Sequence, residues 1–419
     1  MMETFSAEGR HIHIHSLSKF KTNTIVVSFL WPLRTENTPA SYLLSYLLAD
    51  SCMKYPTKQA VLRQLDHLYG ASLNITNEPF GCADRLRFSI SGIESFDHST
   101  RQLEEMMDML AEFIFRPRFE QGAFADSVFH ECMDQAMIGI QECLDDPFFL
   151  CAETASRNYG GAISRRVLPE ISVLKTLTPQ SCAEFWSYVL THARIDIQVL
   201  GNVDVETTRR LVQEKFPFKP RSIRVPISDV MHGNDREVVI EKDIPQSHIV
   251  MLFETACHAG DEDMPALLLG NGVFGSLPVS LLFQKVREEK GLCYSIDSRV
   301  MPFDGILRVS AAGRREAIDE IRTSILSLIE DMKQGKFEAE LLEAARKMTV
   351  NSVRSAQDIA DALLVAYYRR ALVPTTPDFD ALTKRYQAVK KEDIQKRFAA
   401  LTLRTVAIVQ QGGIADETE

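Results

Sequence analysis

A weak internal repeat is the feature of this sequence that most constrains its fold. Four short segments of the first half recur in the second half, in the same order, at offsets that drift only from 224 to 218 residues. Solenoid repeats have periods of ~20–50 residues, so this spacing predicts two copies of one domain, with a chance alignment of apolar strands as the alternative. The matched segments are Ile25–Phe29 with Ile249–Phe253, Gly70 with Gly291, Phe88–Gly92 with Val309–Gly313, and Phe119-Glu120 with Phe337-Glu338.

Each copy predicts the same order of elements: a strand, two helices, a pair of strands and a long amphipathic helix. Apolar residues recur with a helical period from Leu103 to Ile114 and again from Ile318 to Met332. Because the strands are grouped with helices and do not alternate strictly with them, the pattern predicts an α+β fold. We expect two homologous domains, each a mostly antiparallel sheet covered by helices.

The domain boundary is expected between the two copies. A length of 419 residues suggests two or three domains, and the repeat favours two. Prolines and polar residues from Phe216 to Asn234 suit an extended linker. The prediction is an N-terminal domain over 1–220, a linker over 221–236, a C-terminal domain over 237–412 and a flexible tail over 413–419.

Charge, cysteine usage and hydropathy limit the classes of partner. The formal net charge of −10 argues against broad binding to nucleic acid or to anionic membranes. Eight scattered cysteines form no CxxC pair, which favours reduced thiols. The first residues lack the pattern of a signal peptide, and no uncharged apolar run approaches the ~20 residues of a membrane span. We therefore expect a cytoplasmic protein with no nucleic-acid or membrane partner.

The histidines give little support for a metal site. Neither HExxH nor HxxEH occurs among the ten histidines, although either motif would place two ligands on one helix face. The nearest miss, His130–Asp134, is interpreted as an ordinary helix surface. On a strand, His11, His13 and His15 would share one face. The favoured interpretation is an amphipathic first strand with a solvated histidine face, and metal chelation by the three imidazoles is the alternative.

The segment Arg287–Tyr294 is the sharpest local feature. A helix that ends at Gly291 would turn directly into a strand that begins near Tyr294, because glycine suits the left-handed residue after a helix. The guanidinium of Arg287 and the phenol of Tyr294 would then lie close to that turn. Both groups can donate hydrogen bonds to a peptide carbonyl or a developing oxyanion. From spacing alone, however, a solvated helix end without function is the favoured interpretation.

Three segments resemble the insulinase/pitrilysin-type zinc peptidases, the inverzincins, and the resemblance covers almost the whole chain. Leu281–Ile296 is similar to a signature of that family, Leu68–Asn74 resembles its helix-to-strand turn, and Leu200–Asp204 resembles its strand ending in Gly-x-Val-Asp. The resemblance implies that Arg287 and Tyr294 grip the substrate near the scissile bond. It also implies that the strand Ser72, Leu73, Asn74 and Ile75 pairs with an extended peptide, unless that edge is blocked.

The sequence departs from the family at the zinc motif. Active members carry HxxEH on the first helix after the opening strands, and the corresponding stretch here is Tyr42-Leu43-Leu44-Ser45-Tyr46. Tyr42, Ser45 and Tyr46 thus stand in a degenerate zinc motif, and no histidine lies between His15 and His67. Glu131 is the candidate relic of the third ligand. Because a catalytic zinc site typically needs three protein ligands, we expect no metal or other cofactor in this chain.

Family members of this length often pair as two unlike subunits. The resemblance therefore implies a catalytically inactive subunit that pairs with an HxxEH-bearing paralogue, which would hold the zinc. This chain would supply Arg287 and Tyr294 to a peptide or protein substrate. Its nearest branch by resemblance is the bacterial one associated with modification of translation elongation factor P. Two alternatives stay open: a non-hydrolytic peptide-binding or scaffold protein in a protein-modification pathway, and an enzyme that uses a metal held by the histidines of 11–15.

Overall fold

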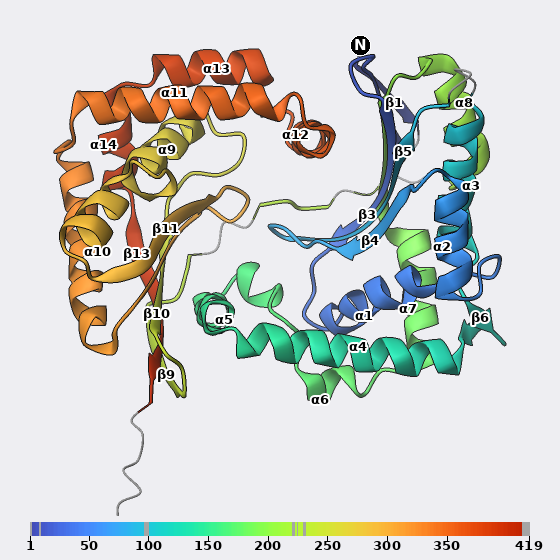
Figure 1. Cartoon of the computed structure of the whole chain (residues 1–419), viewed down its shortest axis with the longest axis horizontal. Helices are drawn as coiled ribbons and strands as arrows, with labels where there is room; N and C mark the ends of the chain where they lie inside the picture. The colour runs from blue at the N-terminus through green and yellow to red at the C-terminus, as the bar shows by residue number, and fades with distance from the viewer. Residues whose placement is uncertain are drawn as a thin grey trace, which may run out of the picture. The chain divides into compact units, whose positions relative to one another are not determined.

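A computed structural model describes residues 2–7, 10–95, 100–219, 223, 225–228 and 232–412 (Figure 1). The chain divides into two units, each with its own sheet and helices. The first unit comprises Met1–Gln141 and Leu168–Pro226, and the second comprises Glu142–Val167 and Ile227–Glu419.

The first unit is built on a six-stranded sheet with the order β1-β2-β8-β3-β5-β4. Only β2 and β8 pair in parallel, and the other neighbours are antiparallel. The strands are β1 (Met2–Ala7), β2 (Arg10–Ser16), β3 (Thr22–Pro32), β4 (Ser72–Asn77), β5 (Ala83–Ile93) and β8 (Arg194–Gly201), with the short pair β6 (Phe119–Glu120) and β7 (Ala123–Phe124) outside the sheet. The helices are α1 (Thr38–Asp50), α2 (Lys58–His67), α3 (Arg101–Phe115), α4 (Asp126–Asp145, whose last turn belongs to the second unit), α6 (Ile171–Leu174), α7 (Pro179–His192) and α8 (Val205–Lys215).

The second unit is built on a five-stranded sheet with the order β11-β12-β10-β13-β9, in which only β13 and β9 are parallel. Its strands are β9 (Arg236–Lys242), β10 (Ser247–Glu254), β11 (Cys293–Met301), β12 (Ile306–Gly313) and β13 (Thr402–Gln411). Its helical segments are α5 (Pro147–Tyr159), η1 (Ile163–Arg165), α9 (Met264–Asn271), η2 (Gly272–Ser276), η3 (Leu282–Glu289), η4 (Arg315–Ala317), α10 (Ile318–Lys333), α11 (Ala339–Ala356), α12 (Ala360–Leu372), α13 (Phe379–Ala388) and α14 (Lys391–Ala399).

The two sheets confirm the duplication predicted from the repeat. With β1 set aside, the order β2-β8-β3-β5-β4 matches β9-β13-β10-β12-β11, and the parallel pair occupies the same place in both. The register agrees as well, because Ile25 faces Ile90 in the first sheet and the repeat-matched Ile249 faces Ala311 in the second. The fold is therefore α+β, with two homologous, mostly antiparallel sheets covered by helices.

Two glycines end corresponding helical segments, as the sequence predicts. Gly70 follows α2 and precedes β4, and Gly291 follows η3 and precedes β11. Their φ angles of +74° and +63° lie in the left-handed region that favours glycine. The sharp turn at each glycine brings the helical segment directly into the edge strand of its sheet.

The units are not consecutive halves of the chain. The predicted N-terminal domain over 1–220 contains Glu142–Val167, which the structure groups with the second unit. The reason is that α5 packs on β10 and β13, where Cys151, Ala155 and Tyr159 join an apolar cluster with Val250 and Leu252. The predicted tail over 413–419 lies outside the described residues, as do several positions of the predicted linker.

The histidine-rich segment is a buried strand, so its interpretation as a solvated first strand is wrong. β2 lies between β1 and β8. Its isoleucines are buried, and so are His13 and His15, at 6% and 1% exposed. Burial, followed by the nearby His13, lowers the pKa of His15 to about 3. Both faces of the strand are covered, and alternation of residue types cannot distinguish a covered polar face from a solvated one.

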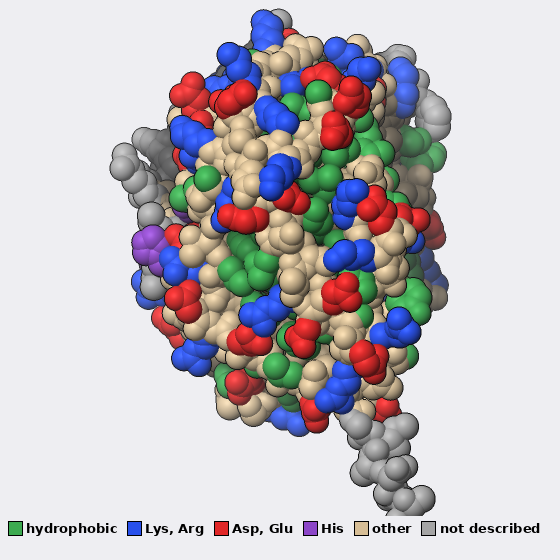
Figure 2. Space-filling view, turned by 90° about the vertical axis from the view of Figure 1, so that its left-hand side faces the viewer, with side chains coloured by type: hydrophobic (Ala, Val, Ile, Leu, Met, Phe, Trp, Pro, Cys, Tyr) green, Lys and Arg blue, Asp and Glu red, His purple; other side chains and the backbone are tan. Residues whose placement is uncertain are grey.

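The surface shows no separation of charge on the face drawn in Figure 2, where basic and acidic side chains are interspersed. Within the described part of the chain, no helix is both long and apolar enough to cross a lipid bilayer.

Candidate functional site

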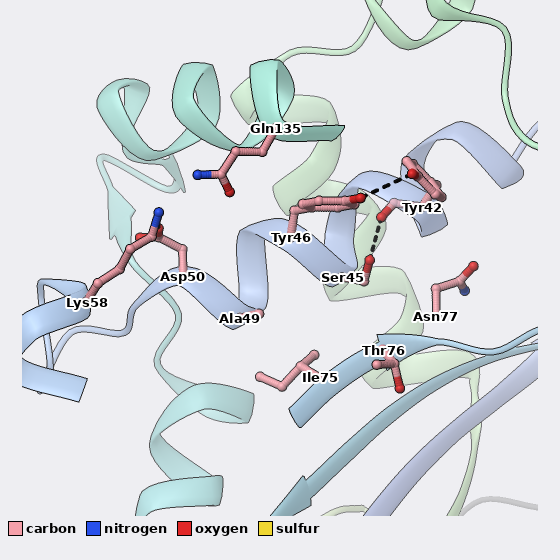
Figure 3. Close-up of a pocket in the computed structure, with 10 residues that line it drawn as sticks. All are labelled: Tyr42, Ser45, Tyr46, Ala49, Asp50, Lys58, Ile75, Thr76, Asn77 and Gln135. Carbon is pink, nitrogen blue, oxygen red and sulfur yellow. Dashed lines mark hydrogen bonds and ion pairs between the residues drawn. The ribbon is translucent and has the colours of Figure 1, made fainter. Parts of the chain in front are cut away.

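A pocket of about 420 Å³ lies in the first unit, between α1, α2, β4 and α4 (Figure 3). It brings together the three positions of the degenerate zinc motif, which come from α1. The strand β4 borders it with its last three residues. The lining residues are Tyr42, Ser45, Tyr46, Ala49, Asp50, Lys58, Ile75, Thr76, Asn77 and Gln135.

The polar groups of the degenerate motif bind one another. The Tyr42 and Tyr46 hydroxyls are 3.1 Å apart, and their ring centroids are 5.5 Å apart. The Ser45 hydroxyl donates to the Tyr42 backbone carbonyl at 2.7 Å. Tyrosine one helical turn from tyrosine keeps both rings on one face of α1. The result is a hydroxyl cluster on one face of α1 whose members bind one another or the backbone.

A glycine on α4 makes room for the two phenols. A Cβ atom at Gly139 would lie 2.9 Å from the Tyr46 hydroxyl oxygen and 3.6 Å from that of Tyr42. The first distance is too short for an ordinary contact, so the missing side chain lets the phenols extend to the backbone of α4. Gly139 thus sets how closely the hydroxyl cluster approaches this wall of the site.

An ion-pair network closes the other end of the pocket. The Lys58 ammonium lies 3.3 Å from a carboxylate oxygen of Asp50 and also donates to Glu131. The hydrogen bond to Glu131 is the largest cause that raises the pKa of Lys58, and Asp50 adds to it against the effect of burial. Lys58 is therefore a cation held between two carboxylates, and its charge is already balanced by the protein.

Glu131, the candidate relic of the third zinc ligand, lies outside the pocket lining. It accepts hydrogen bonds from Lys58 and, at 3.2 Å, from the Gln135 side chain. The pocket is lined instead by Gln135, one helical turn further along α4. The residue that α4 presents to the degenerate motif is thus a neutral amide.

The donor set at this site does not fit zinc. Zinc in proteins is bound by Cys, His, Asp or Glu side chains, whereas the motif positions carry two phenols and a serine. Across the ranges that the structure describes, no group of three or more His, Cys, Asp or Glu side chains is placed to hold a metal ion. Within those ranges, the Asp196 carboxylate lies 3.7 Å from the Nε2 atom of His13. The Arg194 guanidinium binds the same carboxylate oxygen at 2.8 Å.

The predicted peptide-pairing strand forms one edge of the first sheet. Among the described strands β4 pairs only with β5. Ser72 and Asn74 are exposed, Leu73 is half-buried, and Ile75 is buried where it lines the pocket. A peptide added to this edge would run beside the hydroxyl cluster, since an unpaired strand edge offers backbone N–H and C=O groups.

The predicted substrate-gripping pair lies in the second unit. Arg287 is in the last turn of η3, where its side chain is 42% exposed and its guanidinium carbon lies 4.7 Å from the centroid of the Phe283 ring. Tyr294 is the second residue of the edge strand β11 and is 63% exposed. Both donors are accessible, and the role predicted for them stays a prediction.

Sequence reasoning missed six of the ten lining residues: Ala49, Asp50, Lys58, Thr76, Asn77 and Gln135. A signal for Asp50 existed, since Tyr42, Tyr46 and Asp50 recur at four-residue steps and share one face of α1. Gln135 likewise follows Glu131 by four residues on α4. Lys58 had no such signal, because its partners come from two other helices.

Comparison with known proteins finds relatives among the M16 peptidases. A family model described as the peptidase M16 inactive domain matches residues 176–349. The probable inactive metalloprotease YmfF of Bacillus subtilis is 25% identical over 407 residues, which covers 95% of each chain. Over its whole length the chain is thus similar to a probable inactive metalloprotease, and part of it matches the M16 inactive-domain model. The insulinase/pitrilysin-type resemblance is thereby confirmed, and the sequence contains no HxxEH motif.

One further relative and two solved structures are similar to this chain at lower sequence identity. YmxG, an uncharacterized zinc protease of Bacillus subtilis, is 21% identical over 314 residues, with 71% of this chain and 74% of that one covered. A conserved protein from Enterococcus faecalis superposes with a TM-score of 0.91 at 24% identity, over 99% of this chain and 100% of that one. A protease from Helicobacter pylori superposes with a TM-score of 0.80 at 15% identity, over 98% and 99% of the two chains.

Proposed function

We propose that this M16 homologue is the non-hydrolytic subunit of a two-subunit peptidase. A paralogue that carries HxxEH would hold the zinc and the general base. This chain would contribute Arg287 and Tyr294 to the bound peptide or protein. Both donors would act on a peptide carbonyl that gains negative charge during hydrolysis, where preorganised hydrogen bonds have their largest effect.

One observation carries the proposal: the side chains at the motif positions bind one another and the backbone, and they include no group that can activate water. The Tyr42 and Tyr46 hydroxyls bind each other, and the Ser45 hydroxyl binds a backbone carbonyl. None of the three motif side chains is a zinc ligand or a carboxylate base, so these positions give water no route to activation. The exposed pair Arg287 and Tyr294 is meanwhile retained, which suits a chain that binds substrate for a partner.

The test is a peptidase assay on the complex with an HxxEH paralogue. Arg287→Ala should lower the turnover of the complex about 10²–10³-fold, as for loss of one oxyanion-binding donor, without separating the subunits on a sizing column. Tyr294→Phe, which removes only the hydroxyl, should also lower the turnover of the complex.

Lys285→Ala provides a matched control, because Lys285 is a half-exposed cation on the same helical segment and pairs with Glu289. That variant should keep full turnover. Equal turnover of the Arg287→Ala and Lys285→Ala complexes would remove Arg287 from the proposed role.

A second candidate function is peptide binding or scaffolding without hydrolysis. The observation that favours it is the open edge of β4 beside a pocket in this chain itself. Isolated protein that binds an extended peptide as tightly as the complex does would favour this function over the first. The resemblance to the branch associated with elongation factor P makes that factor the first protein to assay.

A further inference from the structure

Three arginines of the second unit gather on one face of its sheet. Arg299 on β11 and Arg308 on β12 are direct cross-strand neighbours. Arg369, in the last turn of α12, is close enough to Arg299 for the two charges to interact. One carboxylate, Asp297, shares this face with them. The group therefore carries three positive charges and one negative charge.

None of the three guanidinium groups has an ion-pair partner among the residues that the structure describes. Two of them rest on aromatic rings instead: the guanidinium carbon of Arg308 is 5.7 Å from the centroid of Phe148, and that of Arg369 is 5.9 Å from the centroid of Phe303. A ring face holds a guanidinium in position but uses none of its five N–H donors. The Arg308 Nε atom is buried and has no hydrogen-bond partner.

This arrangement costs stability in the absence of a ligand. Like charges directly opposite each other on neighbouring strands destabilise a sheet. Burial is the main cause that lowers the pKa of Arg308; Asp297 opposes the shift and Arg299 adds to it. Burial and then Arg299 lower the pKa of Arg369. A cation at a helix C-terminus is commonplace and would account for Arg369 alone, but it does not account for Arg299 facing Arg308.

We propose that Arg299, Arg308 and Arg369 form a binding site for an oxyanion, a carboxylate or phosphate group carried on a peptide. Guanidinium groups bind both through paired N–H donors. The exposed Arg299 and Arg369 would make the first contacts, and the half-buried Arg308 would use the donors that the Phe148 ring leaves free. Asp297 would be repelled by the anion and sets the edge of the site. The site does not depend on pairing with a zinc-bearing subunit.

Calorimetric titration of the full-length protein tests the site with three probes: inorganic phosphate, a blocked tetrapeptide with two central glutamates, and the same peptide with glutamines. We expect phosphate and the glutamate peptide to bind, the glutamine peptide not to bind, and affinity to fall with added salt. Arg299→Gln and Arg369→Gln should each weaken binding about 10–100-fold, the loss of one charge-assisted contact.

Arg236→Gln is the matched control, an exposed arginine on β9 at the opposite edge of the same sheet. It should bind both anions as the unaltered protein does. Binding of phosphate without the glutamate peptide would assign the site to phosphate groups. Equal binding by the Arg299→Gln and Arg236→Gln variants, or no saturable binding by the unaltered protein, would overturn the proposal.

Thermal unfolding gives a second measurement that does not need the ligand. In phosphate-free buffer, Arg299→Gln should raise Tm by about 1–3 °C, because it relieves the repulsion across the strands. In a structural role Arg299 would stabilise the sheet, so a lower Tm for this variant would also contradict the site.

Discussion

The two sheets share one topology, yet their side chains differ at several matched positions of one face. The repeat and the strand registers match four positions of that face in the first unit with four in the second. In the first unit the residues are polar; in the second they are apolar or uncharged. The matched pairs are His15 with Ile240, Ser28 with Leu252, Arg85 with Ile306, and Asp196 with Thr405.

The segment that covers this face of the second sheet explains the difference. There α5 contributes Cys151, Ala155 and Tyr159 to an apolar cluster that includes Leu252 and Ile306. In the first sheet the same positions hold a network in which Arg85 donates to Ser28 and Arg194 to Asp196. One topology thus supports both a dry contact and a buried polar network, because topology fixes where side chains point and not what they are.

The helices next to the sheets differ as well. In the first unit α1 presents Tyr42 and Tyr46 around a pocket. In the second unit α9 places Gly270 where a Cβ would lie 2.8 Å from Phe398 and 2.9 Å from Ile394. Close packing around glycine leaves little space beside that residue. The first unit thus has an accessible pocket beside α1, whereas α9 is closely packed at Gly270.

The largest predicted difference between the two units is in the stability that each loses at low pH. His15 stays neutral in the folded protein because burial lowers its pKa from the ordinary 6.5 to about 3. Below pH 6.5 the unfolded chain binds a proton that the folded chain does not, so stability falls as the pH falls, by about 2 kcal/mol at pH 5 and about 4 kcal/mol at pH 3. Burial lowers the pKa of His11 as well and acts in the same direction.

Both tryptophans, Trp31 and Trp186, belong to the first unit, so their fluorescence reports its unfolding while circular dichroism reports both units. On acidification, tryptophan fluorescence should therefore change at a higher pH than the part of the dichroism signal that comes from the second unit. His15→Gln should move the fluorescence midpoint to lower pH, and His192→Gln, at an exposed histidine of α7, should not. The same midpoint in both variants would show that His15 does not govern acid unfolding.

Leu252→Ala tests the dry contact of the second unit. Removing this fully buried side chain should destabilise the unit by about 2–5 kcal/mol through lost burial and a cavity. Urea unfolding followed by dichroism should show the loss, while the tryptophan transition of the first unit stays in place. A shift of the tryptophan transition by the same amount would mean that the two units unfold together.

Ser28→Ala tests the matched position of the polar network. The Arg85 guanidinium donates to the Ser28 hydroxyl at 3.2 and 2.9 Å, and losing this acceptor should cost about 1–3 kcal/mol because buried donors are left unpaired. Tryptophan-monitored urea unfolding measures the loss. The double variant Ser28→Ala with Arg85→Met should recover part of it, since both polar partners are then gone; a further loss would contradict this account.

The sequence predicted the duplication well because the repeat depends on local signals. Strands have a period of two, amphipathic helices have a period of 3.6, and Gly70 and Gly291 have a backbone conformation that few other residues adopt. It failed where the answer depends on distant packing. An amphipathic helix such as α5 does not reveal which of two homologous sheets it covers, and the alternation in β2 does not reveal that β1 lies on its outer side. The motif positions were found through the family resemblance. Lys58 could not be found in this way, because it lies on α2 and meets its partners on α1 and α4 only in the folded chain.

The smallest predicted effect concerns the wall between α1 and α4. Gly139→Ala gains about 1 kcal/mol of helix propensity, but its Cβ would lie 2.9 Å from the Tyr46 hydroxyl oxygen, and the two effects should nearly cancel. Tyr46→Phe removes that oxygen, so Gly139→Ala should stabilise the Tyr46→Phe protein by about 0.5–1 kcal/mol. A double-mutant cycle of urea midpoints measures the coupling. If Gly139→Ala has the same effect in both backgrounds, the Tyr46 phenol moves away from the new Cβ atom without a cost in stability. In that case the glycine does not position the hydroxyl cluster.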